Sequence, residues 1–379
     1  MDNKNYKNLL KHSFWGNFDT GVILIFLSFY IWDKTENMFT IAIAFIIPVL
    51  IDTVIDYYFS HLSDKKDRVR LLIIGNIGSS VFLSLYGVAQ SIYLLYIFIF
   101  FKSLFAKMYR SSLAPFKREV IKESEYKKFI SKENVKISVG ASVGGFSLMY
   151  IYMYSNSIPL VFIISGLIEL YSTVYLFKLK NVKCIRRKEK EDDLDLNWIK
   201  EITLIYTIEA FGIALIMNRV IIYLHDVYSL GIDMVGLIFF IVYGISNIIA
   251  ANIYSIFKKI SLKNMFILSF VLQAVLLLLF VHLQKLFIIV GLWFIFELIS
   301  NITIIYSRDR INKSLFTDIG KRLSRFRITI AIGGILGQLV ISQIWDNIGV
   351  NESFYFTSII LILLSILITL RNKQVYKKM

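Results

Sequence analysis

Long apolar runs alternate with short polar segments along most of the chain. Positions 41–51 and 271–281 are almost entirely apolar, and comparable runs recur from near the N-terminus to near the C-terminus. A helix that crosses the hydrocarbon core of a bilayer needs roughly 20 such residues. The pattern therefore predicts twelve membrane-spanning helices, six in each half of the chain. They are 13–32, 38–59, 70–90, 92–110, 135–154, 158–178, 199–224, 232–257, 264–283, 286–306, 326–346 and 353–371.

The composition supports this interpretation and removes several other classes of protein. Apolar residues make up 56% of the 379 residues and charged residues only 18%, whereas a soluble domain carries about 25% charged residues. The same figures exclude a disordered chain, and a single cysteine, Cys184, excludes a disulfide-stabilised scaffold. We therefore expect an all-α polytopic protein embedded in a lipid bilayer.

A charged segment divides the spans into two sets of six. This segment, 180–198, is rich in lysine, arginine and acidic residues, and we expect it to be a cytoplasmic linker. Residues 1–179 then form the N-terminal half and residues 199–379 the C-terminal half.

The distribution of basic residues predicts the orientation of the chain. Of the 42 Lys and Arg residues, all but four lie on the side that carries both termini and the linker. Basic residues in short loops stay cytoplasmic, so both termini are predicted to be cytoplasmic in a bacterial-type cell membrane. The net charge of +15 is thus a topology signal and gives no reason to expect nucleic-acid binding. The four exceptions are Lys34, Lys102, Arg219 and Lys285.

A short repeat relates the two halves at an offset of 193 residues. Residues 135–145 (VKISVGASVGG) resemble residues 328–338 (ITIAIGGILGQ), so that Gly140 aligns with Gly333 and Gly144 with Gly337. Each copy opens the fifth span of its half after a basic amphipathic loop. We interpret the halves as pseudo-symmetric six-helix units, which are common in transporters. The alternative is that small residues recur because they permit close packing in membranes.

The loop between the second and third spans carries a recognisable motif. Residues 60–70 read SHLSDKKDRVR, with an acidic residue at Asp64 and basic residues at Lys65, Arg68 and Arg70. This resembles the signature loop of the major facilitator superfamily, although other residues occupy both of its glycine positions. Asp64 could cap a helix start and pair with the loop cations, forming a conformational latch between helices. The alternative is a solvated run of charges.

The fifth span and the start of the chain extend the resemblance. Gly140, Gly144 and Gly145 look like the antiporter motif of that superfamily, with an alanine in place of its proline. Residues 16–19 (GNFD) and 115–134 resemble its macrolide-efflux and siderophore-exporter branch. The resemblance implies the major facilitator fold and a secondary exporter that works by alternating access. We expect a monomer without a cofactor or a bound metal.

Ionisable residues inside the spans are the main candidates for function, because each costs at least about 2.5–3.5 kcal/mol to insert. The resemblance implies that the first, fourth, seventh and tenth spans line a central cavity. Each of these spans carries one such residue: Asp19, Lys102, Glu209 and Glu297. We expect them to serve proton coupling or substrate binding, the alternative being static ion pairs that fix helix packing. Asp52 could join Asp19 near the cytoplasmic mouth or lie at the interface.

Several other polar residues fall in or near the spans. Glu169 lies on the sixth span, which is expected at the outside of the bundle, where it would face the fifth span or a lipid. Arg219 is expected to extend toward the outer interface, and Asp56 toward the headgroups. The histidines have no metal-ligand spacing and lie near span ends, where interfacial polar residues are expected. They are His12, His61, His225 and His282.

These observations predict a proton-coupled exporter rather than an enzyme. A carboxyl group withdrawn from water takes up a proton more readily, so it can carry one between the two faces. Three acids and one lysine sum to a formal charge of −2 when ionised, which favours a cationic or zwitterionic amphiphile such as a drug, siderophore or peptide-like compound. The alternatives are nutrient or ion uptake on the same fold, a non-transporting sensor or immunity protein, and an intramembrane enzyme. No nucleotide-binding loop is visible, which disfavours ATP-driven transport.

Overall fold

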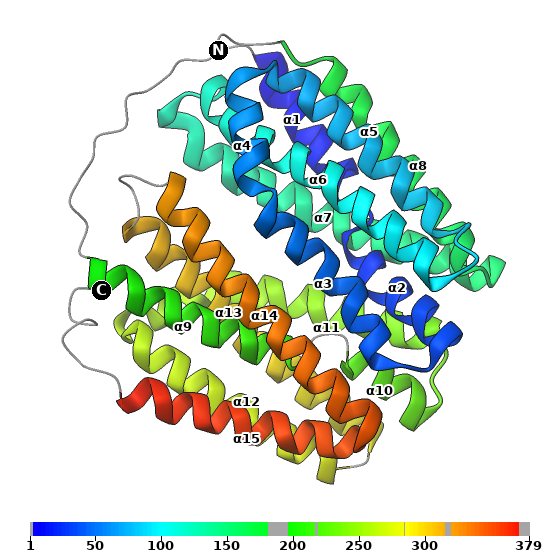
Figure 1. Cartoon of the computed structure of the whole chain (residues 1–379), viewed down its shortest axis with the longest axis vertical. Helices are drawn as coiled ribbons and strands as arrows, with labels where there is room; N and C mark the ends of the chain where they lie inside the picture. Colours follow the sequence, from blue (N-terminus) through cyan, green and yellow to red (C-terminus); the bar gives the residue numbers. More distant parts are fainter. Residues whose placement is uncertain (1–2, 181–195, 217–218, 284, 315–319, 371–379) are drawn as a thin grey trace. The chain divides into compact units, whose positions relative to one another are not determined.

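The computed structural model describes residues 3–180, 196–216, 219–283, 285–314 and 320–370 (Figure 1). Contacts between residues divide the chain into two compact units. The N-terminal unit comprises Met1–Glu36 and Ile43–Arg187, and the C-terminal unit comprises Asn37–Ala42 and Lys188–Met379. Of the predicted linker, residues 181–195 lie outside the described residues.

All the described regular elements are helices. The first half of the chain forms α1 (Asn3–Trp15), α2 (Thr20–Thr35), α3 (Met38–Val54), α4 (Asp56–Lys65), α5 (Arg68–Tyr86), α6 (Ile92–Val120), α7 (Glu123–Ser155) and α8 (Ile158–Phe177). The second half forms α9 (Leu196–Ala214), α10 (Arg219–Tyr228), α11 (Ile232–Ile253), the 3-10 helix η1 (Tyr254–Lys259), α12 (Leu262–His282), α13 (Leu286–Ser314), α14 (Gly320–Asn347) and α15 (Val350–Leu370).

Each predicted span coincides with one helix or with two consecutive helices. Within the described residues, ten helices are long and apolar enough to cross a membrane, and α3 is a shorter apolar helix. The prediction of a single first helix over 13–32 is wrong, because a turn at 16–19 separates α1 from α2. Glycine, asparagine and aspartate in that turn all have low helix propensity.

Helices α6 and α7 are longer than the apolar pattern predicts. Residues 115–134 were expected to be a loop, but α6 continues to Val120 and α7 begins at Glu123. Phe116 of α6 and Phe129 of α7 are fully buried in a cluster with residues of α1, α5 and α8. Burial on one face therefore stabilises helices whose other face is basic and polar.

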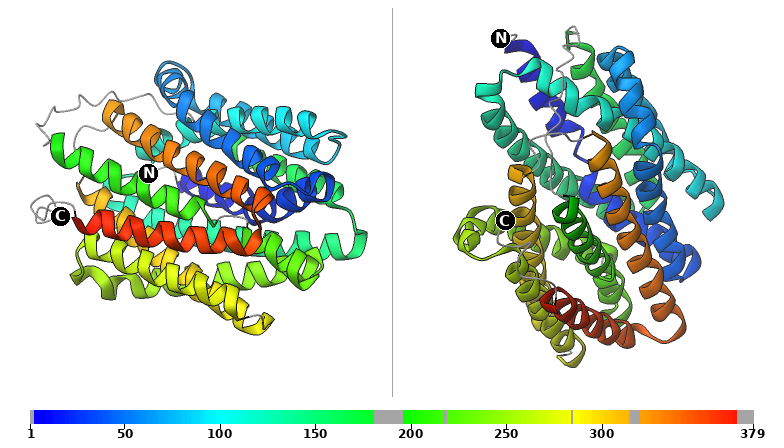
Figure 2. Two further views of the ribbon diagram at one scale, coloured as in Figure 1. Left: turned by 60° about the horizontal axis from the view of Figure 1, so that its bottom comes forward. Right: turned by 60° about the vertical axis from the view of Figure 1, so that its left-hand side comes forward.

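The same helix pairs pack in each unit. In the N-terminal unit α5 packs against α6 and α8, and α7 packs against α1. In the C-terminal unit α12 packs against α13 and α15, and α14 packs against α9. Figure 1 and both views of Figure 2 show α9 (green) alongside α14 (orange). These helix contacts are thus repeated between the two units, in agreement with the sequence repeat.

Glycines of α7 permit a very close helix contact in the N-terminal unit. A Cβ atom added at Gly140 would lie less than 3.0 Å from the carbonyl oxygen of Phe14, and one at Gly144 would lie equally close to that of Phe18. Gly145, the third residue of the predicted motif, is also buried. Side chains at the first two positions would push α7 away from the first span, so glycine is required by packing.

The C-terminal unit reproduces these contacts at the same offset. A Cβ atom at Gly333 would lie less than 3.0 Å from the carbonyl oxygen of Thr207, and one at Gly337 would meet that of Phe211. Both the glycines and the residues that they contact are displaced by 193 positions from their counterparts. The repeat is therefore a repeat of packing geometry as well as of sequence.

Candidate functional site

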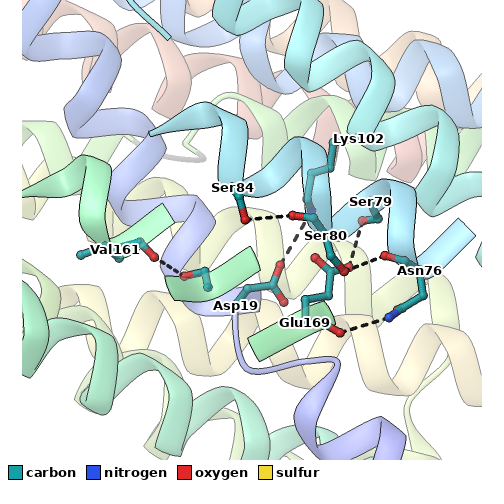
Figure 3. A network of polar contacts seen from close by, with 9 residues as sticks. Asp19, Asn76, Ser79, Ser80, Ser84, Lys102, Val161 and Glu169 are labelled. Carbon is teal, nitrogen blue, oxygen red and sulfur yellow. Dashed lines mark hydrogen bonds and ion pairs between the residues drawn. The ribbon is translucent and has the colours of Figure 1, made fainter. Parts of the chain in front are cut away.

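The break in the first span places an acidic side chain inside the N-terminal unit. Asp19 ends the turn that precedes α2 and is only 6% exposed. Its Oδ2 atom lies 3.8 Å from Nζ of Lys102, which projects from α6 (Figure 3). The structure therefore brings together two of the predicted site residues, and their opposite charges offset part of the cost of burying each.

Glu169 of α8 belongs to the same cluster. Its Oε1 atom accepts a hydrogen bond of 2.9 Å from Ser79 Oγ of α5, and the buried carboxyl group interacts electrostatically with Asp19 and Lys102. The expectation that this residue faces the fifth span or a lipid is wrong, because it faces α5 inside the unit. The sequence signal that could have located its partner Ser79 is the presence of Asn76 and Ser79 in the otherwise apolar third span.

Asn76 of α5 extends the polar cluster along α8. Its Nδ2 atom lies within hydrogen-bonding distance of the backbone oxygen of Glu169 and of the hydroxyl groups of Ser172 and Thr173. Ser172 also donates a hydrogen bond to the backbone oxygen of Glu169. These contacts fix the side of α8 on which Glu169 projects.

His12 of α1 joins this network and is 2% exposed, so the expectation of an interfacial position is wrong for this histidine. Its Nδ1 atom lies 3.1 Å from the carbonyl oxygen of Ser172, and its Nε2 atom lies 2.5 Å from the hydroxyl group of Tyr109. A carbonyl oxygen only accepts hydrogen bonds, so Nδ1 carries the proton and, in the neutral ring, Nε2 accepts from the tyrosine.

Asp52 and Asp56 pair with basic residues of α6 instead of approaching Asp19. Asp52 Oδ1 lies 2.7 Å from Nη2 of Arg110 in a partly exposed pair, and Asp56 Oδ1 lies 2.5 Å from Nζ of Lys107. Of the two alternatives for Asp52, the position beside Asp19 is therefore wrong, and Asp56 extends toward Lys107 rather than toward the headgroups. Both acids hold the second span against the fourth.

In the motif at 60–70 the residue that caps a helix is Asp67 rather than Asp64. Helix α4 continues through Lys65, so Asp64 lies inside a helix, and its side chain is outside the described residues. Asp67 accepts hydrogen bonds from the backbone N–H groups of Val69 and Arg70 at the start of α5. The cap is worth about 1 kcal/mol to the third span.

Arg68 is the motif residue whose contacts join two helices. It forms an ion pair with Glu119 of α6, and its Nε atom donates a hydrogen bond of 3.1 Å to the carbonyl oxygen of Ser63. Lys65 and Arg70 are exposed. Glu119 is not among the residues predicted from sequence, because only the packing of α5 against α6 brings it to the motif.

Glu133 of α7 is a further buried acid that is not among the residues predicted from sequence. It is 3% exposed, and its Oε1 atom accepts a hydrogen bond of 2.7 Å from Ser13 Oγ and lies 2.6 Å from Nζ of Lys117. It therefore ties α7 to α1 and α6. Its position in a segment that looked like a basic loop concealed its burial.

The C-terminal unit holds the other two predicted acids on different helices. Glu209 is buried in α9. Glu297 lies on α13, where Nε1 of Trp293, one turn earlier, donates a hydrogen bond of 3.3 Å to its Oε1 atom. Their helices are the seventh and tenth spans, as the sequence predicted.

Arg219 begins α10 and is buried, so the expectation that it extends toward the interface is wrong. Its Nη1 atom donates a hydrogen bond of 2.9 Å to the carbonyl oxygen of Ala214, and Nη2 donates one of 3.1 Å to that of Gln338. The carbonyl groups at a helix end lack partners within the helix. Arg219 supplies donors at the break between α9 and α10, which the apolar pattern did not reveal.

The described part of the chain contains no group of three or more His, Cys, Asp or Glu residues that could hold a metal ion. His225 contacts the carbonyl oxygen of Leu230, and His282 packs against the ring of Tyr355. The buried carboxyl and imidazole groups can accept and release protons, and the hydroxyl groups beside them donate and accept hydrogen bonds.

Comparisons with known proteins agree with this architecture. Among solved structures, the nucleoside transporter NupG has a TM-score of 0.74 at 13% identity, over 97% of this chain and 98% of that one. The POT family transporter PepTSo has a TM-score of 0.77 at 9% identity, over 97% of each chain. An inward-facing, unoccupied bacterial homolog of the human lysosomal transporter Spinster has a TM-score of 0.73 at 11% identity, over 99% of this chain and 97% of that one.

At these identities the likeness to solved structures shows the fold alone. No curated protein matches the chain. The family model described as the Major Facilitator Superfamily matches residues 14–308, which is more than half of the chain. The protein therefore belongs to the Major Facilitator Superfamily and is a multi-pass membrane protein of the secondary-transporter type, not an enzyme.

Proposed function

We propose that this transporter couples proton movement to the export of a cationic or zwitterionic amphiphile by alternating access. The observation that carries the proposal is the placement of acids away from water. Asp19 pairs with Lys102 in the N-terminal unit, and Glu169 interacts electrostatically with both. Glu209 and Glu297 lie on the seventh and tenth spans. Carboxyl groups in such places exchange protons readily, and each proton carried inward releases about 2.3 kcal/mol per 100 mV.

The excess of acids supports a positively charged substrate. Tetraphenylphosphonium and tetraphenylborate have nearly the same size and opposite charges, so they separate charge from shape. A ligand that binds the folded state raises its thermal midpoint. We expect the phosphonium ion to raise the midpoint of the detergent-solubilised protein and the borate ion to leave it unchanged. Stabilisation by the borate ion alone would contradict the charge argument.

The direction of transport is supported by the likeness of 16–19 and 115–134 to the exporter branch. The glycines of the fifth span give weaker support for export. Gly333 and Gly337 make the same close contacts in the other unit, so the glycines are explained by helix packing. In everted vesicles with an acidic interior, an exporter accumulates the substrate inside. Accumulation only in right-side-out vesicles with an acidic exterior would show uptake instead. Ligand binding without any exchange would indicate a sensor.

Substitution of the C-terminal acids tests the coupling. Glu209→Gln and Glu297→Gln keep the shape of each side chain and remove its titration. We expect each variant to exchange substrate down a gradient but to fail to accumulate it against one. Glu352→Gln, at an exposed acid of α15, is the matched control and should transport normally. Full accumulation by both single variants and by the double variant would refute this assignment.

A further inference from the structure

In the cluster of Asp19, Lys102 and Glu169, the ammonium group lies farther from its carboxylate partner than usual, and one carboxyl oxygen of Glu169 accepts no hydrogen bond from the described residues. Nζ of Lys102 lies 3.8 Å from Asp19 Oδ2, whereas charge-assisted hydrogen bonds measure about 2.7–2.9 Å. Glu169 uses only one carboxyl oxygen: Oε1 accepts from Ser79, while Oε2 is buried and has no hydrogen-bond partner among the described residues. Figure 3 shows these side chains together.

Asp19 and Glu169 depend on the same lysine, Lys102, for a nearby positive charge. The carboxyl group of Glu169 interacts electrostatically with Lys102 and Tyr109 of α6 and with Asp19 of the turn before α2. Tyr86 of α5 interacts electrostatically with both acids. Phenol groups are neutral near pH 7. Among the described residues, Lys102 is therefore the cation that acts on both carboxyl groups.

Two buried carboxylates beside one ammonium group are stable only if one of them is protonated. The pair then titrates as a unit and holds one proton. In the first state the proton is on Glu169 and Lys102 pairs with Asp19, which is the pairing in the structure. In the second state the proton is on Asp19 and Lys102 pairs with Glu169. Each state contains one ammonium, one carboxylate and one carboxylic acid, so charge and protons balance.

We propose that Glu169 is the alternative carboxylate partner of Lys102, and that the lysine and one proton exchange between Asp19 and Glu169 during transport. A proton that arrives at Asp19 releases Lys102, which turns to Glu169 and displaces the proton held there. One proton enters the cluster and one leaves. The proposal rests on proton coupling, the proposed function, and it assigns a role in coupling to the sixth span.

Infrared difference spectroscopy of the purified protein tests the exchange without a substrate, through the carbonyl stretch of protonated carboxylic acids. Relative to the unmodified protein, Glu169→Gln should remove one such band. Asp19→Asn should remove the same band, because Lys102 then pairs with an ionised Glu169. Lys102→Met should add a band, since neither acid then has a cation. Ser79→Ala should shift the band without removing it, which assigns it to Glu169.

Persistence of the band in Asp19→Asn would overturn the exchange, because Glu169 would then stay protonated whatever its neighbour does. An unchanged spectrum in Glu169→Gln would overturn it as well. Both variants are close in shape to the native side chains, and a monodisperse elution profile verifies that each is folded. In vesicles Glu169→Gln should lose accumulation but retain exchange, and full accumulation would overturn the transport role. Because the infrared spectra are recorded without substrate, they test the exchange even if the proposed export proves wrong.

Discussion

Two neighbouring glycines of α14 provide a sharp test of the packing argument. A Cβ atom at Gly333 would lie less than 3.0 Å from the carbonyl oxygen of Thr207 in α9, whereas ordinary contacts measure 3.4–4 Å. A Cβ atom at Gly334 would meet nothing within 4 Å. The perturbing atom is the same in Gly333→Ala and Gly334→Ala, so the second variant is a control for the first.

The magnitude follows from two opposing effects. Alanine is favoured over glycine in a helix by about 0.5–1 kcal/mol, and this gain applies to both variants. The carbonyl oxygen that faces Gly333 belongs to the backbone and cannot rotate away, so α14 and α9 must separate. Such overpacking costs about 1–3 kcal/mol. Gly333→Ala should therefore be less stable than Gly334→Ala by about 1–3 kcal/mol, with Gly334→Ala at least as stable as the unmodified protein.

The assay is unfolding of the purified protein in mixed micelles of increasing denaturing detergent, followed by circular dichroism. The midpoint of Gly333→Ala should fall and that of Gly334→Ala should not. Gly140→Ala should behave like Gly333→Ala, because its added atom also meets a backbone carbonyl group. Equal midpoints for the two α14 variants would refute the inference that glycine is required there by close packing.

Three other predictions follow from individual contacts and from the topology. Asp67→Ala should lower the free energy of unfolding by about 1 kcal/mol through loss of the cap on α5, and no change would contradict the capping role. Glu133→Ala should cost about 3–5 kcal/mol, because the ammonium group of Lys117, whose side chain is 13% exposed, is left without a counter-charge; an effect below 1 kcal/mol in the same unfolding assay would show that water replaces the pair. In sealed cells an impermeant maleimide should label Ser91→Cys and Ser157→Cys but not the native Cys184, and labelling of Cys184 would reverse the predicted orientation.

The candidate coupling residues were identified from sequence by their position within a span. Asp19, Lys102, Glu209 and Glu297 stand out because an ionisable group in an apolar run needs a reason to be there. Their partners could not be inferred in the same way. Glu169 and Ser79 lie 90 residues apart, and only the packing of α8 against α5 places them together.

Besides Glu169, several residues near the ends of the spans were misjudged. Asp56, Arg219 and His12 were expected to reach the interface, yet each contacts another helix of its own unit. Hydropathy describes the average surroundings of a segment and not which face of the helix a residue occupies. A polar residue near a span end is therefore compatible with both locations until the helix pairs are known.

The sequence by itself determined the membrane character, the helical class and the two-fold repeat, because these follow from local apolar length and from residues that recur at a constant offset. The tertiary structure alone decided where the spans break and which buried charges meet. The break at 16–19 places Asp19 beside Lys102, and the packing of α8 places Glu169 close enough to interact electrostatically with both. The physical reason is that pairing energy depends on distances between side chains on different helices, whereas the cost of leaving water can be assessed one segment at a time.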